Sequence, residues 1–113
     1  MSDPVTPDGR VTEPFPGLTR RVLTCTPESM LVEHHMAAGS VFPWHSHHHE
    51  QTVFVLTGEL EVQTRVREGE PVTVRQARAG DSWVVPGHLE HRVTAKSAAR
   101  VLDFFTPFRE DYL

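Results

Sequence analysis

The sequence predicts an all-β protein that folds as one small barrel or sandwich. Short β-type segments follow one another at a regular spacing, with turn signals between them. Nine prolines and seven glycines among 113 residues favour many turns. No apolar pattern of helical period extends beyond two turns. A chain of this length suits a single domain.

About eight or nine strands are expected, in segments that are β-branched or that alternate between apolar and polar residues. The clearest segments are residues 20–26, 29–37, 52–58, 59–67, 72–77, 82–87, 91–95 and 98–105. Before them, residues 1–17 hold four prolines and little periodicity, which predicts a flexible arm or one draped on a partner. The barrel domain is therefore expected over residues 18–113.

Composition excludes several classes of partner. The net charge is −4 and no block of basic residues occurs, so nucleic acid and anionic membranes have no electrostatic support. The apolar runs are too short to span a membrane, and the N-terminus does not resemble a signal peptide. Cys25 is the only cysteine, which excludes an internal disulfide, and a cytoplasmic location is expected.

Edge strands such as 20–26 need cover, which predicts a homodimer.

The stretch PWHSHHHEQT, residues 43–52, predicts a metal site. His45 and His47 are two residues apart, so on a strand they share a face. Gln51 starts the next apolar segment, and His91 starts a more distant one. Imidazole suits Zn, Ni, Fe, Mn or Cu, so one divalent transition metal is expected. Three histidines and one oxygen ligand would leave positions open, as catalytic sites do. The alternative is a solvated turn that binds metal only by accident.

Two segments carry a family resemblance. Residues 39–58, GSVFPWHSHHHEQTVFVLTG, resemble the first motif of the cupins, which runs from a Gly through His-x-His and a Glu to a second Gly. Residues 80–91, GDSWVVPGHLEH, resemble the second motif, with Gly80, Pro86 and His91 at its spacings. The resemblance covers roughly residues 30–106 and implies an antiparallel jelly-roll β-barrel.

Three positions depart from the cupin motifs. Gln51 stands at the Glu ligand, His88 at a Gly and Ala95 at an Asn. Glu50 is adjacent to Gln51 but opposite in strand phase, so Gln51 is the expected ligand. A neutral Gln leaves the full charge on a dication, which favours Lewis-acid chemistry over the dioxygenase chemistry common in cupins with a Glu ligand.

The C-terminal residues 101–113, VLDFFTPFREDYL, add a narrower resemblance, to the small single-domain cupins of the pectin-degradation type. These convert 4,5-unsaturated uronates from pectin or alginate to linear keto forms. The resemblance implies a metal-dependent isomerase with metal ligands His45, His47, Gln51 and His91. It also implies a pocket with the side chains of Asp103, Phe105 and Arg109.

Physical arguments support these three residues independently. Asp103 lies in an apolar strand, in phase with Val101 and Phe105, and an inward carboxylate is costly unless it is paired or functional. It could act as a general acid or base. Arg109 could clamp a substrate carboxylate, and Phe105 could pack against a sugar ring. The alternative is an outward Asp103 and a solvated Arg109.

The remaining histidines have less specific expectations. Only one of the adjacent His34 and His35 can face inward, as a packed or surface residue. His48 and His49 are expected in a loop, where His49 could support a ligand, and His88 lies near the pocket mouth.

Two other functions stay open: a cupin dioxygenase or polyketide cyclase, and a non-catalytic small-molecule binding or sensing cupin.

Overall fold

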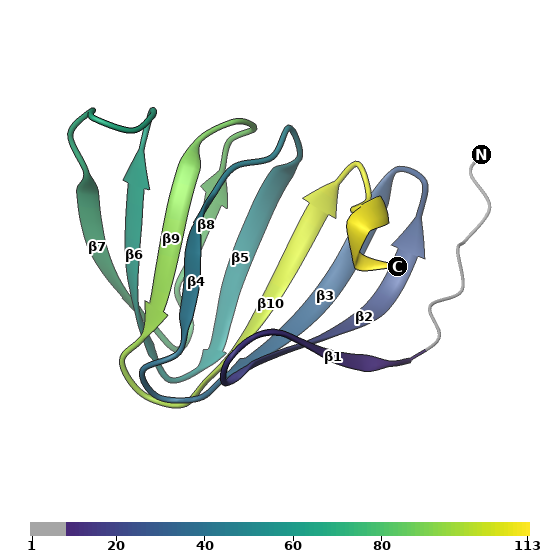
Figure 1. Ribbon diagram of the computed structural model, residues 1–113. Coiled ribbons are helices and arrows are strands. Elements are labelled where there is room, and N and C mark those ends of the chain that lie inside the picture. The colour runs from purple at the N-terminus through teal and green to yellow at the C-terminus, as the bar shows by residue number, and fades with distance from the viewer. Residues whose placement is uncertain (1–8) are drawn as a thin grey trace.

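The computed structural model describes residues 9–113, which form ten strands and one short 3-10 helix (Figure 1). The strands are β1 (Val11–Phe15), β2 (Leu18–Thr26), β3 (Ser29–Met36), β4 (Val41–His45), β5 (Glu50–Thr57), β6 (Glu59–Arg65), β7 (Thr73–Arg78), β8 (Ser82–Val85), β9 (Glu90–Ala95) and β10 (Ala99–Thr106). The 3-10 helix η1 spans Glu110–Tyr112. In the described part of the chain no helix is long and apolar enough to cross a membrane.

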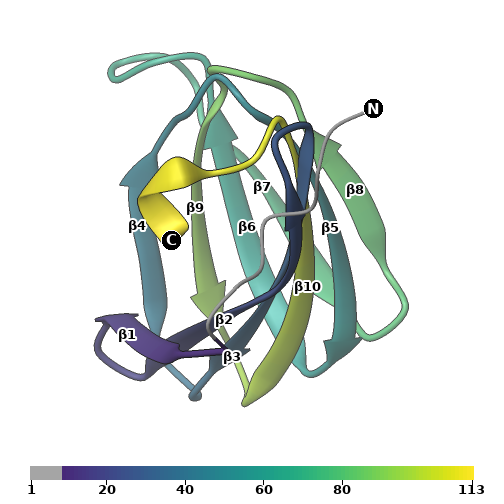
Figure 2. The same cartoon turned by 90° about the vertical axis from the view of Figure 1, so that its right-hand side faces the viewer.

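Two antiparallel sheets face each other and enclose the core. One has the strand order β1-β2-β3-β10-β5-β8, and the other has the order β4-β9-β6-β7. In Figure 2 the segment after β10 runs towards the β4 side of the molecule and ends in η1, which is drawn between β4 and β10. The predicted all-β class and antiparallel jelly-roll barrel are confirmed.

Alternating burial places the core between the sheets. In β10 the buried residues are Ala99, Val101, Asp103 and Phe105, while the residues between them face outward. Val32 and Val55 are fully buried, which stabilises the fold by roughly 1.5–3 kcal/mol for each side chain. A second apolar cluster, at the end that carries η1, consists of Val22, Cys25, Met30, Val32 and Phe105.

The N-terminal segment differs from the expected arm over residues 1–17. Residues 11–15 form strand β1, which pairs antiparallel with β2. Val11 and Thr12 lie opposite Arg21 and Arg20, so this part belongs to the six-stranded sheet. Residues 1–8 of the expected arm lie outside the described residues.

Strand β1 also changes which strands are edges. Residues 20–26, expected at an edge, lie within β2, where β1 pairs with the Leu18–Arg21 part and Val22–Thr26 pair only with β3 among the described residues. The edges of the six-stranded sheet are β1 and β8. Strand β4 was not among the expected strand segments. It ends at His45, so His47 lies in the loop that follows and not on the same strand.

Candidate metal centre and pocket

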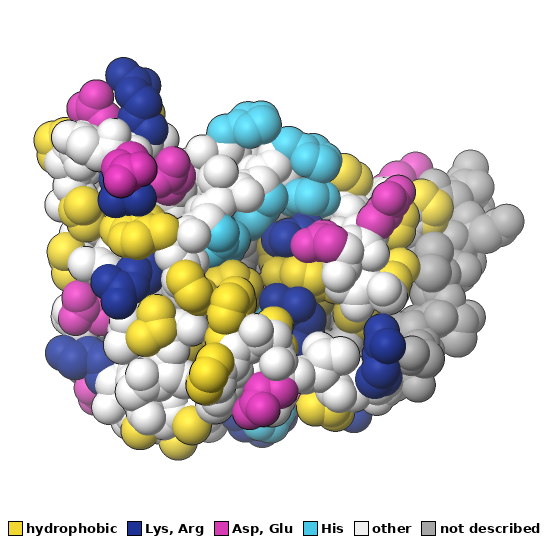
Figure 3. All heavy atoms as spheres, viewed as in Figure 1, with side chains coloured by type: hydrophobic (Ala, Val, Ile, Leu, Met, Phe, Trp, Pro, Cys, Tyr) yellow, Lys and Arg dark blue, Asp and Glu magenta, His cyan; other side chains and the backbone are white. Residues whose placement is uncertain are grey.

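Three histidines meet at the open end of the barrel. His45 ends β4 and lies directly opposite His91 of β9, with 4.0 Å between the ring centroids. His47 approaches from the loop after β4. One ligand nitrogen from each of the three lies within 4.8 Å of the others, so the cluster could hold a metal ion. Figure 3 shows histidine side chains gathered on one part of the surface.

A tight turn brings the two motifs together. A Cβ on Gly87 would lie 2.4 Å from the carbonyl oxygen of His48, so this position has no room for a side chain. The next backbone amide, that of His88, donates a hydrogen bond to the His47 carbonyl at 2.7 Å. His88 has a φ of 69°, in the left-handed region that favours glycine, which explains the cupin glycine at this position. The turn thus docks the His91 segment on the His47 loop.

All three histidines are held in the same tautomer by the backbone. Nδ1 of His45 lies 2.8 Å from the Pro43 carbonyl, and Nδ1 of His47 lies 3.0 Å from that of His49. Nδ1 of His91 is 2.9 Å from the Leu89 carbonyl. A carbonyl only accepts, so each Nδ1 carries the proton and each Nε2 keeps a free lone pair. Carbonyl partners of this kind orient histidines that bind metals.

Burial keeps these imidazoles neutral. Desolvation, followed by the neighbouring His91, lowers the pKa of His45 to about 3. Desolvation and the charge of Arg109 lower the pKa of His47 to about 4. The pKa of His91 is also lowered, chiefly by burial. Its Nε2 is buried with no partner among the described residues. Neutral imidazoles with free Nε2 lone pairs fit a divalent transition metal.

Gln51 faces this cluster from the opposite sheet. It is buried, whereas its neighbour Glu50 is exposed, as strand alternation predicts. Its amide nitrogen donates to Asp103 Oδ1 at 2.7 Å, so the amide oxygen points the other way, 3.1 Å from His47 Nε2. Both of these atoms are acceptors, because the His47 proton is on Nδ1. A cation between them would satisfy both.

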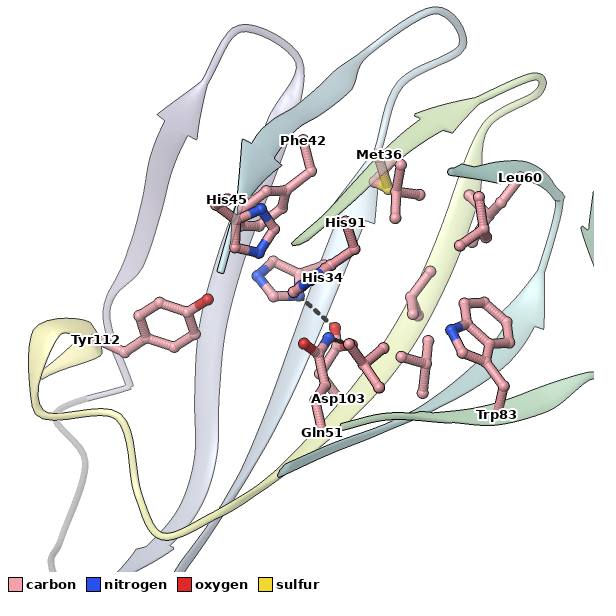
Figure 4. A pocket seen from close by; sticks show the side chains of 15 residues that line it. His34, Met36, Phe42, His45, Gln51, Leu60, Trp83, His91, Asp103 and Tyr112 are labelled. Carbon is pink, nitrogen blue, oxygen red and sulfur yellow. Dashed lines mark hydrogen bonds and ion pairs between the residues drawn. The ribbon is translucent and has the colours of Figure 1, made fainter. Parts of the chain in front are cut away.

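The pocket beneath the histidines is polar at one end and apolar at the other (Figure 4). The polar lining consists of His34, His45, Gln51, His91, Asp103 and Tyr112. The apolar lining includes Met36, Leu60, Val62, Val93 and Trp83. Asp103 is 4% exposed and faces this pocket, so the alternative of an outward Asp103 is wrong. A buried carboxylate next to this histidine cluster can exchange protons with a bound molecule.

Arg109 and Phe105 lie beside the histidines and outside the lining of this pocket. The Arg109 guanidinium lies 5.3 Å from the Phe105 ring centroid and 4.3 Å from that of Tyr112. Its side chain is only 11% exposed and is paired with Asp111. Phe105 is 1% exposed, and its ring packs against His47. Phe105 therefore supports Arg109 and His47, which differs from the expected contact with a sugar ring.

Three residues of the site were missed by the sequence interpretation as functional candidates: Arg20, His34 and Tyr112. Nδ1 of His34 lies 2.6 Å from Asp103 Oδ2, and Arg20 Nε donates to His34 Nε2 at 3.0 Å. Tyr112, on η1, lines the pocket, and burial raises its pKa to about 12, so it remains a neutral phenol. A signal for His34 existed, since it alternates in phase with the buried Met30, Val32 and Met36.

The other histidines take supporting positions. The His49 ring bonds to the Phe108 carbonyl at 3.1 Å, and its backbone carbonyl holds His47, so its support of the site runs through the main chain. His48 is exposed. His35 faces outward and bonds to Glu33 at 2.7 Å. His88 shapes the turn before His91 and does not line the pocket.

The comparisons with known proteins agree with the fold and the motifs. The family model described as "Cupin domain" matches residues 32–105. The chain belongs to the cupin family. The pectin degradation protein KdgF of Dickeya dadantii (strain 3937) is 33% identical to this cupin over 99 residues, covering 86% of the chain and 84% of that protein.

Two solved structures resemble this cupin over most of both chains. KdgF from Halomonas sp. matches it with a TM-score of 0.80 and 33% identity, covering 92% of this chain and 93% of that chain. An RmlC-like cupin from Shewanella frigidimarina matches with a TM-score of 0.82 and 29% identity, covering 94% and 90% respectively.

Proposed function

We propose that this cupin is a metal-dependent isomerase that converts 4,5-unsaturated uronates from pectin or alginate to their linear keto forms. One observation carries the proposal: the buried Asp103 carboxylate and the histidine cluster face one pocket, with Gln51 between them. The likeness to two KdgF proteins, one of them named for pectin degradation, supports the substrate class.

The proposed cofactor is one divalent transition metal, of the group Zn, Ni, Mn, Fe and Cu. Its ligands would be Nε2 of His45, His47 and His91, with the Gln51 carbonyl oxygen as the fourth. The free lone pairs on the three nitrogens and the direction of the Gln51 amide support this set. A bound dication with four neutral ligands supplies Lewis-acid polarisation of a substrate oxygen.

Asp103 is the proposed acid and base. When the uronate ring opens, the anomeric hydroxyl loses a proton, the C1–O5 bond breaks, and a proton is added at C4 as C5 becomes a ketone. One proton leaves and one arrives, so a single carboxylate can accept the first and donate the second. Asp103 accepts one bond at each oxygen, from His34 and Gln51, which leaves further lone pairs for the substrate.

Arg109 is the proposed partner of the substrate carboxylate. Its fork already binds a carboxylate through two hydrogen bonds, at Asp111, which supports bidentate recognition of this group. The rings of Phe105 and Tyr112 hold the guanidinium next to the histidines. The Tyr112 hydroxyl, directed into the pocket in Figure 4, is an additional hydrogen-bond donor for a sugar oxygen.

The direct test follows the ultraviolet absorbance of the conjugated double bond in a 4,5-unsaturated uronate. Metal-loaded protein should accelerate its loss, and a chelator should abolish the effect. Asp103→Asn should lower kcat by about 100-fold or more, as removal of a general acid or base does. Glu50→Gln is the matched control, because it removes an outward carboxylate next to Gln51. Its kcat should equal that of the wild type.

Two results would reject the proposal. Metal-loaded protein that leaves the uronate unchanged would remove the isomerase function. Oxygen uptake by iron-loaded protein, without uronate turnover, would support the dioxygenase alternative instead.

A homodimer in the cytoplasm is proposed as the working form. The outer face of the six-stranded sheet exposes Phe104 of β10, Phe54 of β5 and Val84 of β8, on three strands that are neighbours. A second copy would cover this apolar face. The single buried thiol of Cys25 fits a reducing compartment. Sedimentation analysis should give a dimer, and Phe54→Glu should shift it to a monomer.

A further inference from the structure

A line of four polar side chains crosses the inner face of the six-stranded sheet. Arg20, His34, Asp103 and Gln51 come from β2, β3, β10 and β5, which are neighbours in that order. Arg20 lies directly opposite His34 across the β2–β3 pair. Asp103 is diagonal to both His34 and Gln51, since their direct partners are Val101 and Phe105. Strand register therefore places each of the four within reach of the next one along the line.

The hydrogen bonds along this line have a fixed direction. A guanidinium can only donate, so Arg20 Nε–H donates to His34 Nε2 at 3.0 Å. The proton of the neutral His34 ring is then on Nδ1, which donates to Asp103 Oδ2 at 2.6 Å. Asp103 Oδ1 accepts from the Gln51 amide nitrogen at 2.7 Å. Figure 4 shows the last two bonds converging on Asp103.

The last hydrogen bond of the line determines the orientation of the Gln51 side-chain amide. Because the Gln51 nitrogen is engaged by Asp103, its oxygen must face His47 Nε2, 3.1 Å away. A flipped amide would present its N–H donors to the cluster of imidazoles and would repel a cation there. A wrongly oriented amide would be costly here because water cannot compensate for it. His34, Asp103 and Gln51 are each 9% exposed or less.

We propose that His34 and Arg20 are positioning residues of the metal centre, which hold Asp103 so that the Gln51 amide presents its oxygen to the ion. This inference deepens the proposed metal site and rests on it. The outer face of the same strands provides a comparison, because His35 and Arg21 are the sequence neighbours that face solvent around Glu33. They have similar chemistry without access to the pocket.

The test measures binding of Co²⁺ to the metal-free protein by calorimetry, together with the visible absorption spectrum of the bound ion. His34→Leu should weaken binding by about 10- to 100-fold, the range for residues that support metal ligands, and should alter the spectrum. His34→Asn keeps a donor towards Asp103 and should recover much of the affinity. His35→Leu is the matched control and should match the wild type.

The spectrum separates positioning from general loss of structure, since it reports the ligands around the ion. If His34→Leu does not fold by circular dichroism, Arg20→Met against Arg21→Met replaces it. A smaller loss of affinity and a changed spectrum are then expected for Arg20→Met only. If His34→Leu folds and keeps the wild-type affinity and spectrum, the inference is overturned. If it does not fold, the same result for Arg20→Met overturns the inference. Wild-type protein that binds no Co²⁺ overturns the metal site itself, and with it this inference.

Discussion

The guanidinium of Arg109 holds the carboxylate of Asp111 through two parallel hydrogen bonds, from Nε at 3.0 Å and from Nη2 at 2.7 Å. The partners differ in accessibility, because the Arg109 side chain is 11% exposed and that of Asp111 is 60% exposed. Asp111 therefore occupies the fork that a substrate carboxylate would need, yet it can move into solvent.

The first prediction is that Asp111 competes with the substrate. Ion pairs with an exposed partner contribute about 0.2–1 kcal/mol, so Asp111→Asn should lower KM for a 4,5-unsaturated uronate by about 1.4- to five-fold. The value of kcat should change little, because Asp111 must leave the Arg109 fork before the substrate binds and Arg109 itself is unchanged. Glu110→Gln removes a neighbouring charge that lies outside the Arg109–Asp111 pair and is the control. Equal changes in the two variants would mean that only net charge matters.

The second prediction concerns metal content. His47→Ala should remove most of the bound metal while leaving the fold intact, because it deletes one nitrogen of the cluster and no residue of the core. Elemental analysis and circular dichroism measure the two effects. His48→Ala, in the exposed next position, should bind metal normally. A fully metallated His47→Ala protein would show that the ligand set is wrong.

The third prediction is the pH dependence of metal binding. Burial lowers the pKa to about 3 for His45 and to about 4 for His47, so protons compete with a metal at these two nitrogens only as pH falls towards these values, and the pKa of His91 is lowered as well. Affinity measured by calorimetry should therefore be nearly constant between about pH 7 and about pH 5. Histidines with an ordinary pKa of about 6.5 would lose affinity over this range. Such a loss would contradict the low pKa values.

The fourth prediction explains why a glutamine stands where the cupin motif has a glutamate. Glu at position 51 would bring a carboxylate within about 3 Å of Asp103, judging from the 2.7 Å bond that Gln51 makes. Gln51→Glu should destabilise the metal-free protein at neutral pH by roughly 1–3 kcal/mol, because a buried hydrogen bond becomes a like-charge contact. Denaturant titration measures this. Gln76→Glu, at an exposed position of β7, should have little effect, and equal effects would reject the explanation.

The sequence predicted those parts of the site that depend on local spacing. His45, His47, Gln51 and His91 were identified from motifs, and alternation favoured Gln51 over Glu50. Arg20 and His34 were not identified because their roles depend on which strands are neighbours. Alternation says that His34 shares a face with Val32, but it cannot say that β3 lies between β2 and β10.

The fold was predicted more completely than its ends. The proline-rich start suggested an arm, yet Val11–Phe15 pairs with β2. Proline is compatible with an edge strand, because the backbone N–H groups on its outer edge need no partner strand. Strand β1 is such an edge strand. Similarly, Phe105 alternates as a pocket residue would, but it is covered by Phe108 and Tyr112, which lie beyond the strand.

The ligand candidates come from both sheets, since His45 and His91 belong to the four-stranded sheet and Gln51 belongs to the six-stranded one. An ion held by all of them would cross-link the two sheets at this end of the barrel, where strand pairing does not join them. Metal at about 100 times its Kd would stabilise the fold by about 2.7 kcal/mol. The cation would then restrain the opening of the barrel as well as activate a substrate, and backbone amides near that end should exchange with solvent more slowly when it is bound.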